Sequence, residues 1–229
     1  MSAIVHSQVF LLTLTIGVYL GASWLRRRID LAVLHPVLVS IVAMIGFVRF
    51  SGITYEHYMQ QTQVIDFLLG LSVVALGYVL HDQIRNIRGN VIAIVVAILT
   101  GSAVGIVSVA LIARWMGADA AVVASLEPKS VTTAIALSLS ANAGGIPSLT
   151  SVVVIVVGVF GGIVGPWVLR KVGVESRIAK GLAMGAAAHA MGTARAMELG
   201  AVEGAISGLA IGLMGIATAV LVPILQKIL

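Results

Sequence analysis

The sequence of 229 residues contains no cysteine, which excludes a disulfide framework and any metal site with thiolate ligands. Charged residues are also scarce, at 10% of the chain, where a soluble domain carries about 25%. Hydrophobic residues make up 59% instead, and the mean hydropathy is +1.11. These proportions exclude an ordinary soluble domain and indicate a protein whose solvent is the lipid bilayer.

Motifs for the common catalytic and nucleotide-binding sites are missing as well. The sequence has no Walker A lysine motif, no GxGxxG after a strand, no HExxH, no GxSxG and no carboxylate pair at ligand spacing. We therefore expect no enzyme activity, no catalytic residue, no bound metal and no cofactor, and a gradient-driven process rather than an ATP-driven pump. The net charge of +5 comes from basic residues in short loops between apolar runs, which are topology signals and not a nucleic-acid surface.

Long apolar runs predict the fold class, because a membrane-spanning helix needs about 20 such residues. The uninterrupted runs are 9–25, 33–50, 91–116, 148–169 and 205–225. Three further apolar stretches are shorter or interrupted: 64–80, 118–141 with a break at 127–129, and 181–200 with a break around His189 and Gly192. The pattern predicts an all-α polytopic membrane protein with seven to eight membrane segments.

Basic residues near the ends of the runs orient the chain, because Lys and Arg stay on the cytoplasmic side. They place residues 26–28, 85–88 and 170–180 inside. Simple alternation fails at the last loop unless residues 118–141 form a re-entrant hairpin that enters from outside. Pro128 supports a turn there, since proline removes a backbone donor and disfavours helix in the residue before it.

A weak internal repeat divides the second half of the chain. Residues 129–136 align with 189–196, which gives two hairpin-plus-helix units, 118–170 and 177–229. One intervening span gives these units opposite orientations, so the sequence predicts an inverted repeat whose two broken segments meet near the middle of the membrane. Transporters place their substrate sites in such an arrangement. We expect residues 1–117 to serve as scaffold and dimerisation half, and residues 118–229 to carry the function.

Polar side chains inside the apolar runs are the candidate site, because each ionisable group at membrane depth costs about 2.5 to 3.5 kcal/mol on insertion scales. Arginine offers a carboxylate a bidentate fork, lysine a point charge, and hydroxyls suit a hydroxyl or keto oxygen. The predicted substrate-binding residues are Lys129, Ser130, Thr132, Thr133, His189, Thr193, Arg195 and Glu198. The residues predicted to shape the hairpins are Glu127, Pro128, Gly144, Gly145, Pro147, Ser148 and Gly192.

Structural roles compete with these assignments. Arg195 and Glu198 stand three residues apart on one helix face and could neutralise each other. Lys129 could extend to an interface, and His189 could be a hydrogen bonder in helix packing. The hydroxyls could satisfy backbone groups freed by the breaks, and Glu127 is either the residue at the tip of the hairpin or a proton-coupling carboxylate.

Glycines occur at the spacing of closely packed helices. Gly181 and Gly185 lie four residues apart, as do Gly204, Gly208 and Gly212. Small residues at this spacing let two backbones approach closely. They indicate tight packing and carry no chemistry.

Four ordered motifs resemble one membrane protein family. They are PKSVTT at 128–133, GGIPSLT at 144–150, GTARA at 192–196 with Glu198 and Leu199, and Glu203-Gly204 followed by SGLA at 207–210. Together they resemble the signature of the LrgB/CidB/YohK family. The resemblance extends over nearly the whole chain in length and span pattern, and its specific motifs lie within 125–215.

The resemblance implies two alternative functions. Plastid relatives carry glycolate and glycerate and some bacterial relatives are linked to pyruvate uptake, which implies a secondary transporter of small 2-hydroxy or 2-oxo monocarboxylates, coupled to protons or sodium or to exchange. Other bacterial relatives are described as holin-like or antiholin-like regulators of murein hydrolase activity and lysis, paired with a small LrgA/CidA-type membrane protein. The resemblance also implies a multi-pass protein of the bacterial inner membrane. We expect a homodimer. Of the two functions we expect transport, because substrate binding would explain the polar residues in both breaks.

Overall fold

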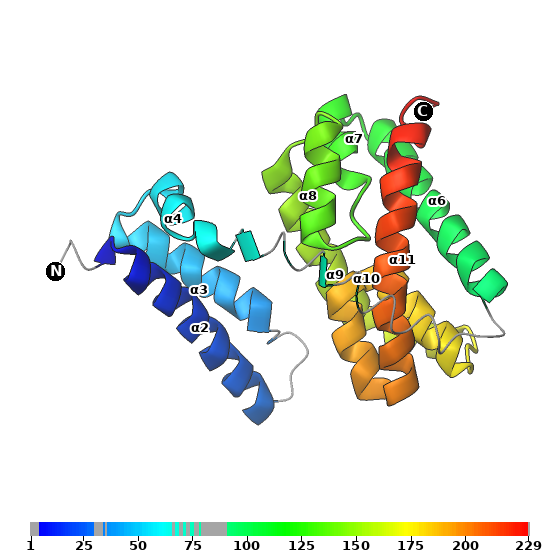
Figure 1. Cartoon of the computed structure of the whole chain (residues 1–229), viewed down its shortest axis with the longest axis horizontal. Helices are drawn as coiled ribbons and strands as arrows, with labels where there is room; N and C mark the ends of the chain where they lie inside the picture. Colours follow the sequence, from blue (N-terminus) through cyan, green and yellow to red (C-terminus); the bar gives the residue numbers. More distant parts are fainter. Residues whose placement is uncertain are drawn as a thin grey trace. The chain divides into compact units, whose positions relative to one another are not determined.

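The computed structural model describes residues 5–29, 34, 36–65, 67–68, 71, 74–75, 78 and 91–228. The regular secondary structure within these residues is helical, as the sequence predicts (Figure 1). The chain divides into two compact units, Met1–Leu71 and Ser72–Leu229.

The first unit is built from α2 (Gln8–Arg28), α3 (Pro36–Ser51) and α4 (Tyr55–Gln61). The hydroxyl of Ser7 caps the start of α2, and basic residues 26–28 in its last turn favour the negative end of the helix dipole. Helices α3 and α4 are bent by 117° at a short break. The hydroxyls of Thr15 and Tyr58, 3.0 Å apart, join α2 to α4.

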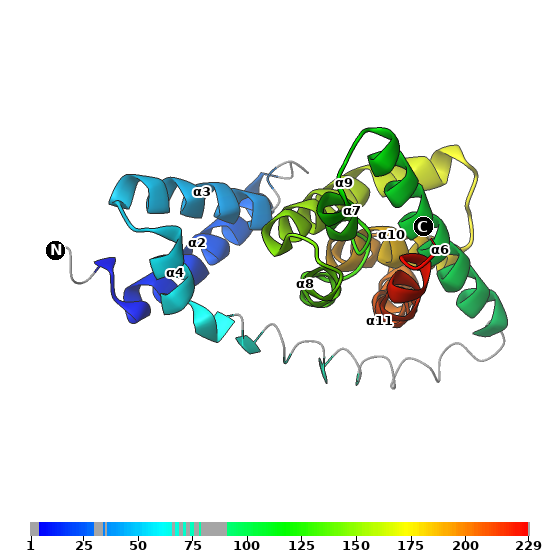
Figure 2. The same ribbon diagram turned by 90° about the horizontal axis from the view of Figure 1, so that it is seen from above.

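The second unit contains the elements that the sequence analysis singled out. Its helices are α6 (Val91–Trp115), α7 (Ala120–Leu126), α8 (Thr133–Asn142), α9 (Pro147–Lys171), α10 (Arg177–Leu199) and α11 (Ala201–Leu225). In Figure 2 α11 is seen almost along its axis, with α6, α8 and α10 around it. Half of the most apolar window of α11 is buried, against 22% for α6 and 17% for α9. This helix is therefore the centre of the unit.

The core of the second unit joins residues from α6, the α7–α8 break, α9 and α11. Ile94, Val131, Val154 and Leu209 are at most 2% exposed and belong to one apolar cluster. Many large apolar side chains face outward instead, such as Phe160 at 65% exposure. An apolar exterior is expected where lipid replaces water as the solvent.

Four of the predicted spans correspond to long helices. The ranges 9–25, 91–116, 148–169 and 205–225 match α2, α6, α9 and α11, all of which are long and apolar enough to cross a membrane. A fifth span results if the bent pair α3 and α4 is counted as one. The range 64–80 lies largely outside the described residues, so the total of seven to eight segments stays a prediction. Both broken stretches, 118–141 and 181–200, are interrupted as expected.

The compact units and the predicted halves have different boundaries. Helix α6 lies within residues 1–117, which were assigned to the scaffold, yet it packs against α7 and α11 in the second unit. The division at 117 was drawn from the repeat and from the polar motifs. As a functional boundary it stays a prediction.

Candidate functional site: two broken helices on one long helix

The first break separates α7 from α8. Helix α7 ends at Leu126, Glu127 and Pro128 are buried, and α8 begins only at Thr133. The side chain of Thr132 caps α8 by accepting a hydrogen bond from the backbone N–H of Ile135 at 3.5 Å. Residues 127–132 are therefore a non-helical connection, placed where Pro128 predicts one.

This connection is held by contacts with the residue after α11 and with α6. The side-chain amide of Gln226 donates to the Glu127 carboxylate at 2.5 Å, and Glu127 is 3% exposed. The Lys129 ammonium donates to the backbone carbonyl of Gly105 on α6 at 2.7 Å. Backbone and amide groups thus satisfy the two ionisable side chains of the break.

Buried hydroxyls fix α7 and α8 to the start of α9. The Ser125 hydroxyl accepts from the N–H of Ile146 at 2.7 Å, and the Thr150 hydroxyl donates to that of Ser140 at 2.6 Å. A Cβ on Gly145 would lie 3.0 Å from the Ser125 backbone nitrogen. These contacts require the small residue at 145.

The second break folds α10 back on itself. In a straight helix Met184 and Gly192 are about 12 Å apart along the axis. Here a Cβ added to Gly192 would overlap the carbonyl oxygen of Met184. The reversal occurs at Ala188 (φ −130°, ψ 16°) and His189 (φ 41°, ψ −129°). Helix α10 therefore consists of a first arm, 177–187, and a second arm, 190–199.

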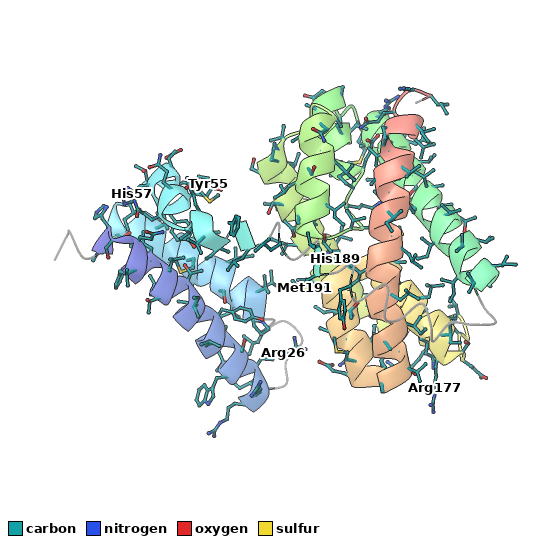
Figure 3. The ribbon with its side chains drawn as sticks, viewed as in Figure 1. Arg26, Tyr55, His57, Arg177, His189 and Met191 are labelled. Atoms are coloured by element: carbon teal, nitrogen blue, oxygen red, sulfur yellow. The ribbon has the colours of Figure 1, made fainter. Side chains whose placement is uncertain are left out.

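His189 at the tip of this fold-back is 4% exposed, and its Nε2 donates to the carbonyl oxygen of Val154 at 2.9 Å. Figure 3 shows Arg177 at the lower end of the second unit and His189 with Met191 in its interior. A Cβ on Gly158 would lie 2.5 Å from the His189 ring. The tip is thus held by one hydrogen bond, and it lies close to α9 because Gly158 has no side chain.

Both broken segments run along α11 and approach its middle from opposite ends. Glu127 contacts residue 226, and Ile135 packs against Gly215, about 16 Å nearer the start of α11. From the other end, Gly185 of α10 lies against Ser207 and residue 210. The two segments therefore reach positions 210 and 215, which are about 7 Å apart along α11. The sequence repeat itself stays a prediction.

The candidate cations Lys129 and Arg195 do not meet. Lys129 binds the carbonyl of residue 105, one turn beyond Ser102, whose hydroxyl lies 3.0 Å from that of Thr218 on α11. Arg195 lines a cavity with Glu203. Positions 203 and 218 are about 22 Å apart along α11. The expected joint carboxylate site of Lys129 and Arg195 does not fit this geometry, and each role in binding stays a prediction.

Several of the predicted substrate-binding residues have contacts that give them a structural role. Arg195 forms an ion pair with Glu198, and both side chains are nearly half exposed. The hydroxyls of Thr193 and Ser207 are hydrogen-bonded at 2.7 Å and join the second arm to α11. Thr132 serves as a helix cap. The roles of these groups in substrate binding stay predictions.

The remaining predicted residues lie around the first break. Ser130 is half-buried near Gly105, and Thr133 is the first residue of α8. Gly144 has φ 76°, a value that favours glycine, in the turn between α8 and α9. Pro147 begins α9, as proline often begins a helix, and Ser148 is exposed.

The lower end of the second unit contains a polar cavity of about 160 Å³. It lies between the end of α9, both arms of α10 and the start of α11. The sequence analysis used its residues Arg170 and Lys180 only as topology signals, and it did not select Glu203. Basic residues on both sides of the short connection 172–176 were the signal that could have found it. The cavity is lined by Pro166, Leu169, Arg170, Lys180, Arg195, Leu199 and Glu203.

Metal ligation is not visible in the part of the chain that the structure describes, where no group of three or more His, Asp or Glu side chains is placed to hold an ion.

Comparison with known proteins gives consistent matches along the chain. The model of the LrgB-like family matches residues 15–228. The uncharacterised protein YwbG of Bacillus subtilis (strain 168) is 34% identical over 214 residues, which cover 93% of this chain and 95% of YwbG. The holin-like protein CidB of Staphylococcus aureus (strain N315) is 33% identical over 217 residues, 95% of each chain. No solved structure matches.

Proposed function

Because this chain belongs to the LrgB-like family, we propose that it is a secondary transporter of small monocarboxylates in the bacterial inner membrane. Its substrates are 2-hydroxy or 2-oxo acids such as glycolate, glycerate or pyruvate. The long apolar helices and the relatives indicate a multi-pass membrane protein.

The approach of two broken segments to the middle of α11 is the observation that carries this proposal. Carriers build their substrate sites from interrupted helices, because non-helical backbone at membrane depth is tolerated only where protein or a cavity surrounds it. Polar groups of both breaks are hydrogen-bonded to neighbouring helices, as at Lys129–Gly105 and Thr193–Ser207. A polar, interrupted centre packed in this way suits a gated carrier better than an open hole.

A holin-like function is the second candidate, and it is supported by the similarity to the holin-like protein CidB. In this function the chain would regulate murein hydrolase activity and lysis by changing membrane permeability. A small LrgA/CidA-type membrane protein would then be its partner. Homodimerisation is proposed for either function.

Flux into proteoliposomes separates the two candidates. Purified protein is reconstituted, and uptake of labelled glycolate and pyruvate is measured together with uptake of glycine and of a dye added outside the vesicles. A carrier gives saturable uptake of the acids that unlabelled acid inhibits, while glycine and dye stay excluded. Equal leakage of all four solutes contradicts transport and supports the holin-like function. Vesicles that pass none of them contradict both functions for this chain acting alone.

A further inference from the structure

We propose that the cavity between α9, α10 and α11 binds a small monovalent oxyanion, the carboxylate of an acid with two or three carbons. Its basic residues, Arg170, Lys180 and Arg195, come from the end of α9 and from both arms of α10. Arginine and lysine are the side chains that bind carboxylates in proteins. That the acid is a transported substrate rests on the proposed function; the binding site itself does not.

The charge balance of the cavity sets the charge of its ligand. Three basic side chains line it, together with the carboxylate of Glu203, which is 6% exposed. Glu198 already pairs with Arg195. Three positive and two negative charges leave one positive charge, which one carboxylate neutralises. Glu203 is buried, whereas Arg170 and Arg195 are exposed and Lys180 is half-buried. A monoanion leaves these groups with no net charge, so it fits the site better than a dianion or a neutral solute.

The size and walls of the cavity limit the carbon skeleton. A volume of about 160 Å³ corresponds to roughly five water molecules at about 30 Å³ each. Pro166, Leu169 and Leu199 supply an apolar side next to the basic groups. Such a space suits a short acid with one charged end.

The location gives the site a role in the fold-back of α10. Lys180 stands in the first arm and Arg195 in the second, 15 positions apart in sequence, yet both line one small cavity. An anion between them draws the two arms together. The basic loop 170–180 is predicted to be cytoplasmic, so we place this site at the cytoplasmic entrance of the pathway and not at its centre.

Binding of glycolate to the purified full chain tests the proposal. Lys180→Gln and Arg170→Gln are each compared with Lys171→Gln, a matched control. Lys171 neighbours Arg170 and carries the same charge, but its ammonium lies 5.9 Å from the centre of the Trp167 ring and does not line the cavity. Loss of one charged hydrogen bond should weaken glycolate affinity by roughly ten- to 150-fold. The Lys171 variant should bind within about twofold of wild type.

The outcomes distinguish this site from the proposed function. Elution and melting profiles identify any variant that fails to fold, and two variants on different helices keep the test open if one does. Wild-type protein that binds no glycolate or pyruvate, or cavity variants that bind like the Lys171 control, overturn the site. Citrate that competes as well as glycolate overturns the argument from charge and size. Binding that depends on Lys180 without saturable vesicle uptake supports the site and contradicts the transport proposal alone.

Discussion

Replacement of His189 by glycine and by alanine tests the fold-back of α10 most directly. Both changes remove the hydrogen bond to the Val154 carbonyl and leave the same space beside Gly158. The two variants therefore differ only in how well their backbone tolerates φ 41° at this position. Their relative stability reports the local backbone and not the lost side chain.

The expected difference has opposite signs in a fold-back and in a regular helix. In a helix interior alanine is more favourable than glycine by about 1 kcal/mol. In the left-handed region an L-residue with a Cβ costs about 1 to 2 kcal/mol, which glycine avoids. His189→Gly should therefore be more stable than His189→Ala by about 1 to 2 kcal/mol. For a chain of this size that corresponds to a melting temperature about 2 to 8 °C higher.

Thermal unfolding of the two purified variants in one detergent, followed by tryptophan fluorescence, measures this order. Wild type should melt above the alanine variant, because both carry the unfavourable φ at this position and only wild type has the hydrogen bond from His189 to Val154. An alanine variant that melts at or above the glycine variant would refute the reversal at this residue. The proposal for the cavity, which needs both arms of α10 at one place, would fall with it.

Two further predictions concern packing and topology. Gly185→Ala should lower the melting temperature by an amount equivalent to about 1 to 3 kcal/mol, because its Cβ would lie 2.8 Å from that of Ala210; Gly208→Ala, with nothing within 4 Å, should be neutral or stabilising. Equal melting temperatures would contradict the close contact of α10 and α11. In this cysteine-free chain, a cysteine at Glu175 should be labelled from the cytoplasmic side and one at Asn142 from the opposite side; labelling of both from one side would disprove the first re-entrant hairpin.

The sequence was sufficient to predict the family and both interruptions. Four short motifs predicted the LrgB family, and the match over residues 15–228 confirms it. Pro128 indicated the first break because proline acts on the backbone of its own neighbours. The second break was placed around His189 and Gly192, and the reversal occurs at the first of these. Gly192 acts differently, since its missing Cβ lets the second arm lie against the first at Met184.

The contacts that the sequence could not predict are those between residues far apart in the chain. Spacing along the chain placed Lys129 and Arg195 in the two aligned segments of a repeat, but it carried no information on their levels along α11. Arg170 and Lys180 were recognised as basic residues of a loop. Only the fold-back of α10 brings Lys180 and Arg195 to one cavity. Buried pairs such as Ser102 and Thr218, 116 positions apart, have no local signal at all.

The contacts of α11 have a consequence for the length of this helix. Residues 203–210 contact the second broken segment, whereas residues 215–226 contact the first. A helix turns by about 100° for each residue. Deletion or insertion of one residue between positions 210 and 215 would therefore rotate one set of contacts away from its partner while leaving every side chain unchanged. This stretch should therefore tolerate an apolar substitution of similar volume better than a change in residue number.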